Sequence, residues 1–440
     1  PALLAQSAQQ LAAHVEKHQL SVASVAAALA NRQAFDARAA FLATSREQLI
    51  NTLQGLQAAL TNHQPMPAGV AYAEAPVPAE SRKLAFLYPG QGAQKVGLLE
   101  DLVKRFPFLS QRLAELDAAA KDAAGCSIVD ALYPKDRSNL AAAQAHLTRT
   151  EVCQPAMAAL GLALSEFLGT LGVSADVALG HSLGEFAAAA SAGMLSAEDS
   201  VRLVARRGQL MNALKLTDPG AMLAVMAEAS AVEPFLPKLT GVSLANHNHP
   251  TQVVLSGTTS GIEAAQKLLT DAGLKCTRLD VSHAFHSPLM AGIDAGMQKL
   301  ISELAVHPPQ RAVVSCISGR TYDSVSDAKA IWVKHATAPV RFVDGLESCL
   351  TLGASVFVQV GAGNALTSFA RGVAKNAQGF FTLGSADGAD GVMPFFQTLA
   401  AMWVKGAPVN AAPLFDRTTM ALLPPFLQHP DEEVRQFAAA

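Results

Sequence analysis

The sequence predicts an α/β protein with three parts: an α/β hydrolase-like core around a parallel sheet, an inserted ferredoxin-like subdomain, and a small α+β domain before them. Three observations support this prediction. Short apolar segments alternate with helical segments from Lys83 onward, one predicted strand ends in a turn that carries a serine, and residues 215–283 follow a different order of elements. With 440 residues, 50% of them hydrophobic, the chain can bury a large core.

The first 80 residues are expected to form the small α+β domain. Residues 2–17 and 45–60 have apolar side chains at helical spacing, and residues 34–43 alternate like a strand. Prolines at 65, 67, 76 and 78 then indicate a linker, because proline disrupts helices and central strands. We therefore place a domain boundary near residue 80, with residues 1–80 before it.

The central domain, residues 81–400, is predicted in two parts. The large subdomain comprises residues 81–214 and 284–400, with strands expected at 84–88, 175–179, 312–316 and 355–360. The small subdomain, residues 215–283, has the order strand, helix, strand, strand, helix, strand, which is typical of a ferredoxin-like fold. Its predicted elements are 221–227, 230–239, 243–246, 252–255, 260–272 and 276–281. Residues 401–440 are rich in proline and are expected to be extended.

Composition excludes several classes of function. The 33 basic and 36 acidic residues give a net charge of -3, so we expect no nucleic-acid partner. The five cysteines are widely spaced and contain no Cys-x-x-Cys pair, which indicates buried thiols in a reducing compartment. We find no apolar run of about 18 residues and no basic secretory signal, so we expect a soluble cytoplasmic protein without a membrane partner. The start at Pro1 fits either processing or a fragment of a longer chain.

The strongest catalytic signal is Gly180-His181-Ser182-Leu183-Gly184. It follows a predicted strand and precedes the helix-forming residues 185–190, which is the context of a nucleophile elbow. Such a turn presents the serine hydroxyl at a helix N-terminus, where free backbone N–H groups can stabilise an oxyanion. We therefore predict that Ser182 is a nucleophile.

A serine nucleophile needs a base within hydrogen-bond reach. His283 and His286 are candidates because they lie where the small subdomain returns the chain to the core, although either could be a core histidine. His181 is expected to stabilise the turn or to line the pocket.

A guanidinium group could bind a substrate carboxylate through two hydrogen bonds. The predicted helix 197–214, which has Ser196 as its N-cap, carries Arg202, Arg206 and Arg207. Periodicity alone places at least two of these three on a solvated face.

Four motifs, in order over about residues 83–400, resemble those of malonyl-CoA:acyl carrier protein transacylases. They are Phe86-Leu87-Tyr88-Pro89-Gly90-Gln91-Gly92-Ala93-Gln94, Gly180-His181-Ser182-Leu183-Gly184-Glu185, Arg206-Arg207-Gly208 and His283-Ala284-Phe285-His286. Residues 1–80 resemble the linker between ketosynthase and acyltransferase in modular polyketide synthases. Trp403 to Phe415 and Leu423-Pro424-Pro425-Phe426 resemble the linker that follows the acyltransferase. The resemblance is therefore to the acyltransferase region of a type I polyketide synthase.

The resemblance implies a role for each site residue. Ser182 would be acylated, and His286 would be the general base and acid, with its imidazole oriented by the backbone carbonyl of His335. Arg207 would pair with the carboxylate of the extender unit. The backbone N–H groups of Gln91 and Leu183 would form the oxyanion hole. The substrate pocket would also be lined by His181, His283 and Phe285.

Substrate and partners also follow from the resemblance. It implies malonyl transfer from malonyl-CoA to the phosphopantetheine thiol of an acyl carrier protein, with no metal or other cofactor and with a neighbouring ketosynthase domain. Phe285 before the histidine and Leu183 after the serine favour malonyl over methylmalonyl, a steric discrimination of about 1–3 kcal/mol. The segment Gln359-Val360-Gly361-Ala362-Gly363 departs from the Glu-Val-Gly-Pro-Gly of the family.

Three other functions make different demands on these residues. A thioester hydrolase on the same scaffold would use Ser182 and His286 but would gain nothing from Arg207. A methylmalonyl-selective transferase would use all three residues. A non-catalytic docking module would be expected to have lost the serine or the histidine, and both are present.

Overall fold

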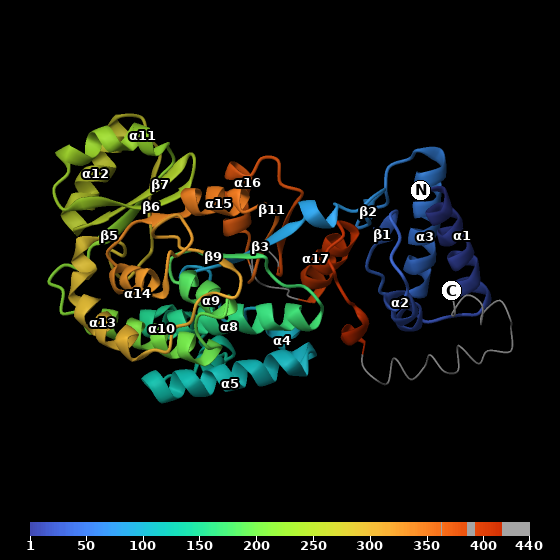
Figure 1. The fold of residues 1–440 in the computed structure, drawn as a ribbon, viewed down its shortest axis with the longest axis horizontal. Helices are drawn as coiled ribbons and strands as arrows, with labels where there is room; N and C mark the ends of the chain where they lie inside the picture. Colours follow the sequence, from blue (N-terminus) through green and yellow to red (C-terminus); the bar gives the residue numbers. More distant parts are fainter. Residues whose placement is uncertain (362, 385–391, 416–440) are drawn as a thin grey trace. The chain divides into compact units, whose positions relative to one another are not determined.

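The computed structural model describes residues 1–361, 363–384 and 392–415 (Figure 1). The chain divides into two compact units. Of the described residues, one unit contains Pro1–Arg82, Leu168–Ser174 and residues 395–415, and the other contains Lys83–Phe167 and those between 175 and 394. Residues 395–415 thus group with the N-terminal residues, whereas the sequence predicts a boundary at 400. Every predicted site residue lies in the second unit.

The first unit is built on three helices and a short antiparallel pair of strands. The helices are α1 (Ala2–Lys17), α2 (Val22–Ala30) and α3 (Arg46–Asn62), and β1 (Arg38–Ala40) pairs with β2 (Ala71–Ala73). Two of the helices agree with the prediction, but α2 was missed because it is apolar all round and lacks a polar stripe. The strand expected over 34–43 is shorter, and β2 lies inside the predicted linker.

The C-terminal part of this unit is only partly extended. It contains α17 (Val392–Val404), which begins in the second unit, and a 3-10 turn at Ala412–Leu414. Arg38 donates a hydrogen bond to the carbonyl of Trp403 at 3.1 Å and its guanidinium lies 5.3 Å from the indole ring. The motif predicted at 423–426 lies outside the described residues.

The second unit has a five-stranded parallel sheet at its centre. Its strands are β3 (Lys83–Tyr88), β4 (Val177–Gly180), β9 (Ala312–Val314), β11 (Ala354–Gln359) and β12 (Gly379–Thr382), in the order β12-β11-β3-β4-β9. All four predicted strands are present, with shifted ends, and β12 was not predicted. Because β3, β4 and β11 are buried on both faces, their sequences are almost continuously apolar.

Helices cover this sheet. Before the insert they are α4 (Glu100–Arg105), α5 (Pro107–Ala124), α6 (Ile128–Leu132), α7 (Leu140–Thr148), α8 (Thr150–Thr170), α9 (Gly184–Ser191) and α10 (Ala197–Asn212). After it they are α13 (Asp294–Glu303), α14 (Val325–Lys334), α15 (Phe342–Thr351) and α16 (Ala365–Val373). Two of them, α15 and α16, pack on one face of the sheet, where Leu346 and Leu366 meet Leu87 and Phe357 in one apolar core.

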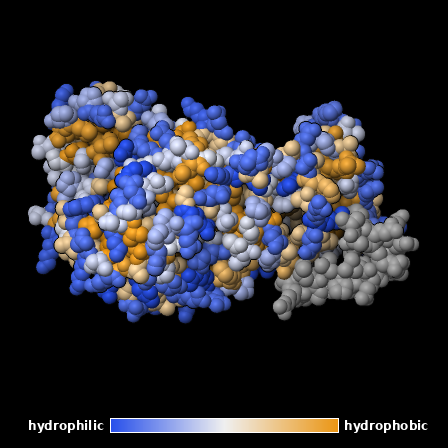
Figure 2. Space-filling view, in the orientation of Figure 1, coloured by the Kyte–Doolittle hydropathy of each residue, from blue (hydrophilic) through white to orange (hydrophobic). Residues whose placement is uncertain are grey.

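One helix, α8, is long and apolar enough to cross a membrane by length and composition, contrary to the expectation from the sequence. Within this helix, 83% of the 18-residue apolar stretch is buried inside the protein. We therefore interpret α8 as a core helix. On the face visible in Figure 2, hydrophobic side chains are interspersed with hydrophilic ones.

The insert forms a second sheet. It contains β5 (Ala221–Val225), β6 (Val242–His249), β7 (Gln252–Gly257) and β8 (Cys276–Arg278), with α11 (Ala229–Val232), a 3-10 helix (Glu233–Lys238) and α12 (Thr259–Asp271). The order β6-β7-β5-β8, with antiparallel neighbours, has the predicted element sequence and the strand arrangement of a ferredoxin-like sheet. The predicted helix 230–239 is mostly 3-10 because it contains Pro234 and Pro237.

A fifth strand, β10 (Val340–Arg341), completes this second sheet from outside the insert. It pairs in parallel with β6, so that Val340 lies beside Asn246 and Arg341 beside His247. Helices α11 and α12 cover one face of this sheet (Figure 1). The opposite face carries Met222, Ala224 and Val254, against which Phe285 packs. The residues from β10 into Phe342 therefore join the small sheet, through β10, to the core of the large sheet, through Phe342.

We predict that Phe357→Ala lowers the free energy of unfolding by about 3–5 kcal/mol, because it opens a cavity in the fully buried centre of the large sheet. Urea denaturation measures this change. Phe108→Ala is the control, since Phe108 is 38% exposed, and we expect a loss below about 1.5 kcal/mol. Equal losses in the two variants would contradict the assignment of the core.

Candidate active site

Two turns meet at the carboxyl ends of the neighbouring strands β3 and β4. The amide of His181 donates to the carbonyl of Tyr88 at 2.9 Å. A Cβ atom on Gly184 would lie 2.1 Å from that same carbonyl oxygen, and a Cβ on Gly90 would lie 2.5 Å from the carbonyl oxygen of His181. Only glycine fits at these two positions, so the glycines of both motifs allow the turns to pack against each other.

Ser182 lies at the tip of the second turn, between β4 and α9, as the elbow motif predicts. Its backbone has a φ of 49°, in the left-handed region that non-glycine residues rarely adopt. Its Oγ lies 2.6 Å from Nε2 of His286. Of the two candidate histidines, the structure therefore places His286, and not His283, against the serine hydroxyl.

His286 is held by the backbone of residues 336–338. Its Nδ1 donates to the carbonyl of Ala338 at 2.9 Å, and its own amide donates to the carbonyl of Ala336 at 2.9 Å. Because the proton sits on Nδ1 to make the first bond, Nε2 carries the lone pair that faces Ser182. The imidazole is thus oriented to accept the serine proton.

The orienting carbonyl was predicted wrongly as that of His335. Helix α14 ends at Lys334, and His335 keeps a helical conformation. The chain leaves the helix only beyond this residue, so the carbonyl that reaches the imidazole belongs to Ala338. His335 instead contributes its side chain to the site. Its Nδ1 lies 3.3 Å from Nη2 of Arg207.

Burial controls the protonation of His286. Its side chain is 3% exposed, and burial lowers its pKa well below the ordinary value, with further lowering by His335 and Arg207 and an opposing effect of the Ala338 carbonyl. The imidazole is therefore neutral at pH 7, which is the form that can act as a base.

The predicted oxyanion donors lie on the two adjoining turns. Leu183 is the N-cap residue of α9 and is buried, and Gln91 follows Gly90 at the end of β3. Within the described ranges, neither backbone N–H has a hydrogen-bond acceptor. A Cβ on Gly90 would come within 3.5 Å of the Leu183 nitrogen, which shows how closely the two turns approach.

Arg207 is the buried one of the three arginines, at 3% exposure, whereas Arg206 is exposed. Its Nη1 donates to Oε1 of Gln154 at 2.8 Å and its Nη2 to His335. Burial lowers the pKa of Arg207 to about 10, which leaves it cationic at neutral pH. Among the residues that the structure describes, no carboxylate lies within ion-pair distance of it, and its Nε has no partner.

The remaining predicted residues surround this centre. His181 donates through Nε2 to Oδ1 of Asn248 at 2.7 Å, which links the serine turn to β6 of the small sheet. Burial lowers its pKa. Phe285 packs on the small sheet and its ring centroid lies 5.8 Å from that of His283, which is partly exposed.

Three participants were missed in the sequence: Gln154, the carbonyl of Ala338, and Glu185. Glu185 is fully buried in α9, whereas the sequence pattern predicts only a helix-forming residue at this position. Burial raises its pKa, but the nearby imidazole of His335 and hydrogen bonds from Tyr322 and the Cys316 amide outweigh this effect and lower it, so the carboxylate is ionised. A lone charge in the apolar helix Gly184–Ser191 was a signal that could have been recognised.

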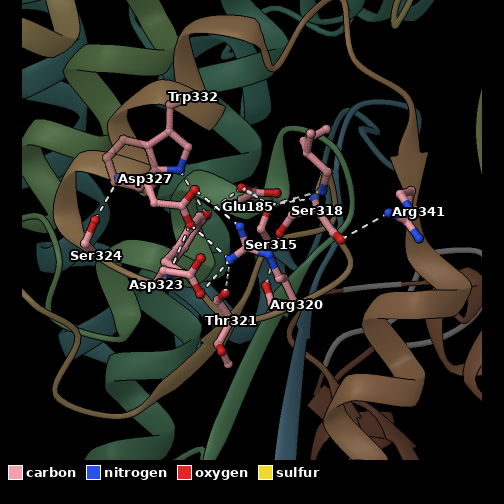
Figure 3. Close-up of polar contacts among 12 residues, drawn as sticks. Glu185, Ser315, Ser318, Arg320, Thr321, Asp323, Ser324, Asp327, Trp332 and Arg341 are labelled. Carbon is pink, nitrogen blue, oxygen red and sulfur yellow. Dashed lines mark hydrogen bonds and ion pairs between the residues drawn. The ribbon is translucent and has the colours of Figure 1, made fainter.

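A hydrogen-bond network surrounds this carboxylate (Figure 3). Ser315 Oγ and the Cys316 amide each donate to it at 2.8 Å, and the Tyr322 hydroxyl donates as well. The side chains of Glu185, Cys316 and His335 also bring three possible metal-ligand atoms within 4.8 Å of one another. The carboxylate oxygens already accept these hydrogen bonds, and we interpret the cluster as a network of hydrogen bonds.

Comparison with known families identifies the fold. Residues 85–385 match the family model described as "Acyl transferase domain". The chain belongs to the acyl transferase domain family. It is therefore an enzyme of the acyltransferase type, as the four motifs predicted, and the α/β class of its fold is confirmed.

Similar proteins fall into two groups. The acyltransferase is 36% identical over 355 residues to "Polyketide synthase GfsB" of Streptomyces halstedii, which covers 79% of this chain and 6% of that protein. It is 32% identical over 297 residues to "Malonyl CoA-acyl carrier protein transacylase" of Bacillus subtilis, which covers 66% of this chain and 90% of that protein. The chain thus spans only a small part of the polyketide synthases that it matches.

Solved structures agree with this relationship. The acyltransferase domain from the second module of the salinomycin polyketide synthase superposes with a TM-score of 0.77 at 33% identity, covering 94% of each chain. The domain from module 8 of the same synthase gives a TM-score of 0.80 at 29% identity. The resemblance to acyltransferases of type I polyketide synthases is therefore confirmed.

We predict that acid destabilises this acyltransferase below about pH 6.5. Burial lowers the folded-state pKa values of His181, His286 and His335, so the unfolded chain binds protons more readily than the folded one. Their contribution to stability is complete above the unfolded pKa of about 6.5 and is lost as the pH falls toward the folded values. Urea unfolding at pH 7.5 and 5.5 measures the difference.

The control for this prediction is His307→Gln, because His307 is exposed. This variant should keep the full pH dependence, whereas His286→Asn should reduce it by removing one buried imidazole. Identical pH dependence in the wild type and in His286→Asn would contradict the prediction.

Proposed function

We propose that this acyltransferase transfers a malonyl group from malonyl-CoA to the phosphopantetheine thiol of an acyl carrier protein, within a polyketide synthase. The observation that carries the proposal is the 2.6 Å contact between Ser182 Oγ and His286 Nε2, in a buried site that also holds the cation of Arg207. A nucleophile, a neutral base and a cation free of any described carboxylate are what transfer of a dicarboxylic monothioester requires.

In the first half-reaction, Nε2 of His286 takes the proton of Ser182 as Oγ attacks the thioester carbonyl. The negative charge that develops on the carbonyl oxygen is stabilised by the N–H groups of Gln91 and Leu183. The bond between carbon and sulfur then breaks, and His286 returns the proton to the sulfur of CoA. The product is malonyl-Ser182 and free CoA.

In the second half-reaction the steps run in reverse with another thiol. His286 takes the proton of the phosphopantetheine thiol, the sulfur attacks the serine ester, and the Ser182 oxygen leaves with the proton from His286. The carbonyl of Ala338 keeps the imidazole in one tautomer throughout both halves. These residues complete the reaction as written, so the proposal includes no metal or cofactor.

Arg207 provides the preference for a free carboxylate. A guanidinium can hold a carboxylate through two parallel hydrogen bonds, and the interaction is strong where water is excluded. A hydrolase or transferase for simple acyl chains would have no use for this buried cation. The name of the Bacillus subtilis relative supports the assignment of malonyl-CoA and an acyl carrier protein as substrates.

The place of the domain in a larger assembly is also part of the proposal. The polyketide synthase relatives are much longer than this chain, which supports a neighbouring ketosynthase domain. Residues 1–80 and those after 400 would then be the linkers on either side of the acyltransferase.

We expect brief incubation with malonyl-CoA to add one malonyl group to the protein, as measured by intact-mass spectrometry. Ser182→Ala should abolish the adduct because it removes the nucleophile. Arg207→Ala should lower malonyl loading about 100-fold, since a charged hydrogen bond to the carboxylate is worth about 1.5–3 kcal/mol.

The same measurement separates the alternatives. Accumulation of free CoA without any adduct would overturn the transferase assignment in favour of hydrolysis. Acetyl loading faster than malonyl loading would overturn the role of Arg207. An adduct that persists in Ser182→Ala would contradict the choice of nucleophile.

Phe285 is proposed to exclude a methyl substituent on the extender unit. The ring packs against Met222, Ala224 and Val254 of the small sheet, which restricts its movement away from the site. We predict that Phe285→Ser raises methylmalonyl loading relative to malonyl loading about 10-fold or more, within the roughly 1–3 kcal/mol available from one methyl group. Competition between the two CoA esters, read by mass, measures the ratio. An unchanged ratio would contradict the role of Phe285 in selectivity. The matched control is Phe235→Ser, on the opposite face of the small sheet, which should leave the ratio unchanged.

A further inference from the structure

Glu185 occupies an unusual position, because it is an ionised side chain with no exposed surface. It lies in the first turn of α9, three residues after the nucleophile. Ser315, the Cys316 amide and Tyr322 donate to it, and Trp332 donates in turn to the Tyr322 hydroxyl at 3.0 Å. Figure 3 labels Glu185, Ser315 and Trp332 of this network. These donors fix the carboxylate, and its Oε2 lies 3.7 Å from Nε2 of His335. Nε2 of His335 is buried and has no hydrogen-bond partner among the described residues, so the carboxylate acts on it by electrostatic attraction across this distance.

His335 links this carboxylate to Arg207. A guanidinium has donors only, so Nδ1 of His335, 3.3 Å from Nη2 of Arg207, accepts the hydrogen bond. The imidazole proton then lies on Nε2, on the side of Glu185. The carboxylate favours this tautomer, and the tautomer in turn gives Arg207 its acceptor.

Few other contacts hold the guanidinium. Gln154 accepts from Nη1, and the ring of Phe186 lies 5.7 Å from the guanidinium carbon and 5.0 Å from the His335 ring. Nε of Arg207 is buried without a partner. If the imidazole proton moved to Nδ1, an N–H group would face the donors of Arg207, and the guanidinium would have to turn away.

We propose that Glu185 is a positioning residue that acts through His335 to hold the Arg207 guanidinium in the orientation that receives the free carboxylate of the acyl donor. This inference rests on the proposed function. It assigns to Glu185 the preference for dicarboxylic over simple acyl groups, while the acyl-transfer chemistry itself stays with Ser182 and His286.

The test compares two donors in one variant. In Glu185→Gln, the rate constant for loading of Ser182 from malonyl-CoA should fall about tenfold or more, because misplacement of a binding group by about 1 Å has effects of up to 100-fold. Loading from acetyl-CoA, which has no carboxylate to place, should change by less than about twofold. Intact-mass spectrometry of quenched reactions gives both rate constants, and thermal unfolding shows whether the variant is folded. Glu347→Gln, at an exposed position of α15, is the matched control and should change neither rate.

A double-variant cycle tests the route of the effect. If Glu185 acts through Arg207, the malonyl loss caused by Glu185→Gln should almost vanish when Arg207 is already alanine. Equal loss of malonyl and acetyl loading in Glu185→Gln, or an effect that persists in full beside Arg207→Ala, would mean a merely structural role and would overturn the inference.

Variants of His335 decide the question if Glu185→Gln does not fold. His335→Asn keeps an acceptor near the position of Nδ1, whereas His335→Leu removes it. The inference predicts that the ratio of malonyl to acetyl loading is retained better by the asparagine variant, by about tenfold or more. Equal ratios in the two variants would overturn it. Failure of the wild type to load malonyl on Ser182 at all would instead overturn the proposed function.

Discussion

The hydrogen bond from Nδ1 of His286 to the carbonyl of Ala338 is the constraint on which the site depends. It sets the tautomer of the imidazole and therefore the lone pair that faces Ser182. The segment that provides this carbonyl continues directly into β10, which pairs with the small sheet, and then into Phe342 of α15, which is buried against the large sheet. A few residues thus fix the base and connect both sheets, so the geometry of the serine and histidine pair depends on how the two sheets are joined.

Burial determines the charges at the site. The same removal of water that keeps His286 neutral also places Arg207 in a low-dielectric environment, where a cation without an anion is unfavourable. Glu185 supplies a buried negative charge, but the imidazole of His335 separates it from the guanidinium. Arg207 is therefore stabilised by an anion that is not in contact with it and keeps donors for another carboxylate.

Local patterns in the sequence were enough to predict the parts of the site that depend on neighbouring residues. The strand, turn and helix around Ser182 follow from glycines at positions where any side chain would clash with neighbouring backbone. The order of elements in the insert follows from the alternation of strand-like and helix-like segments in its sequence. The orienting carbonyl and β10 depend on a chain segment about 50 residues after His286. Glu185 gives a weaker signal, a single charge in an apolar helix, because its burial arises from long-range packing that the neighbouring residues do not specify.

Hydrolysis and transfer require the same serine and histidine, so these two residues do not distinguish the reactions. The distinguishing feature is the buried cation, since removing a guanidinium from water is unfavourable unless an anion replaces the lost hydration. Gln154 and His335 replace the lost hydration only in part, because both are neutral acceptors and Nε has no partner among the described residues. In the proposed function, a donor with a free carboxylate completes the interactions of Arg207 on binding, whereas a simple acyl chain leaves them incomplete. The buried charge of Arg207 is therefore the feature on which the proposed preference for a dicarboxylic donor rests.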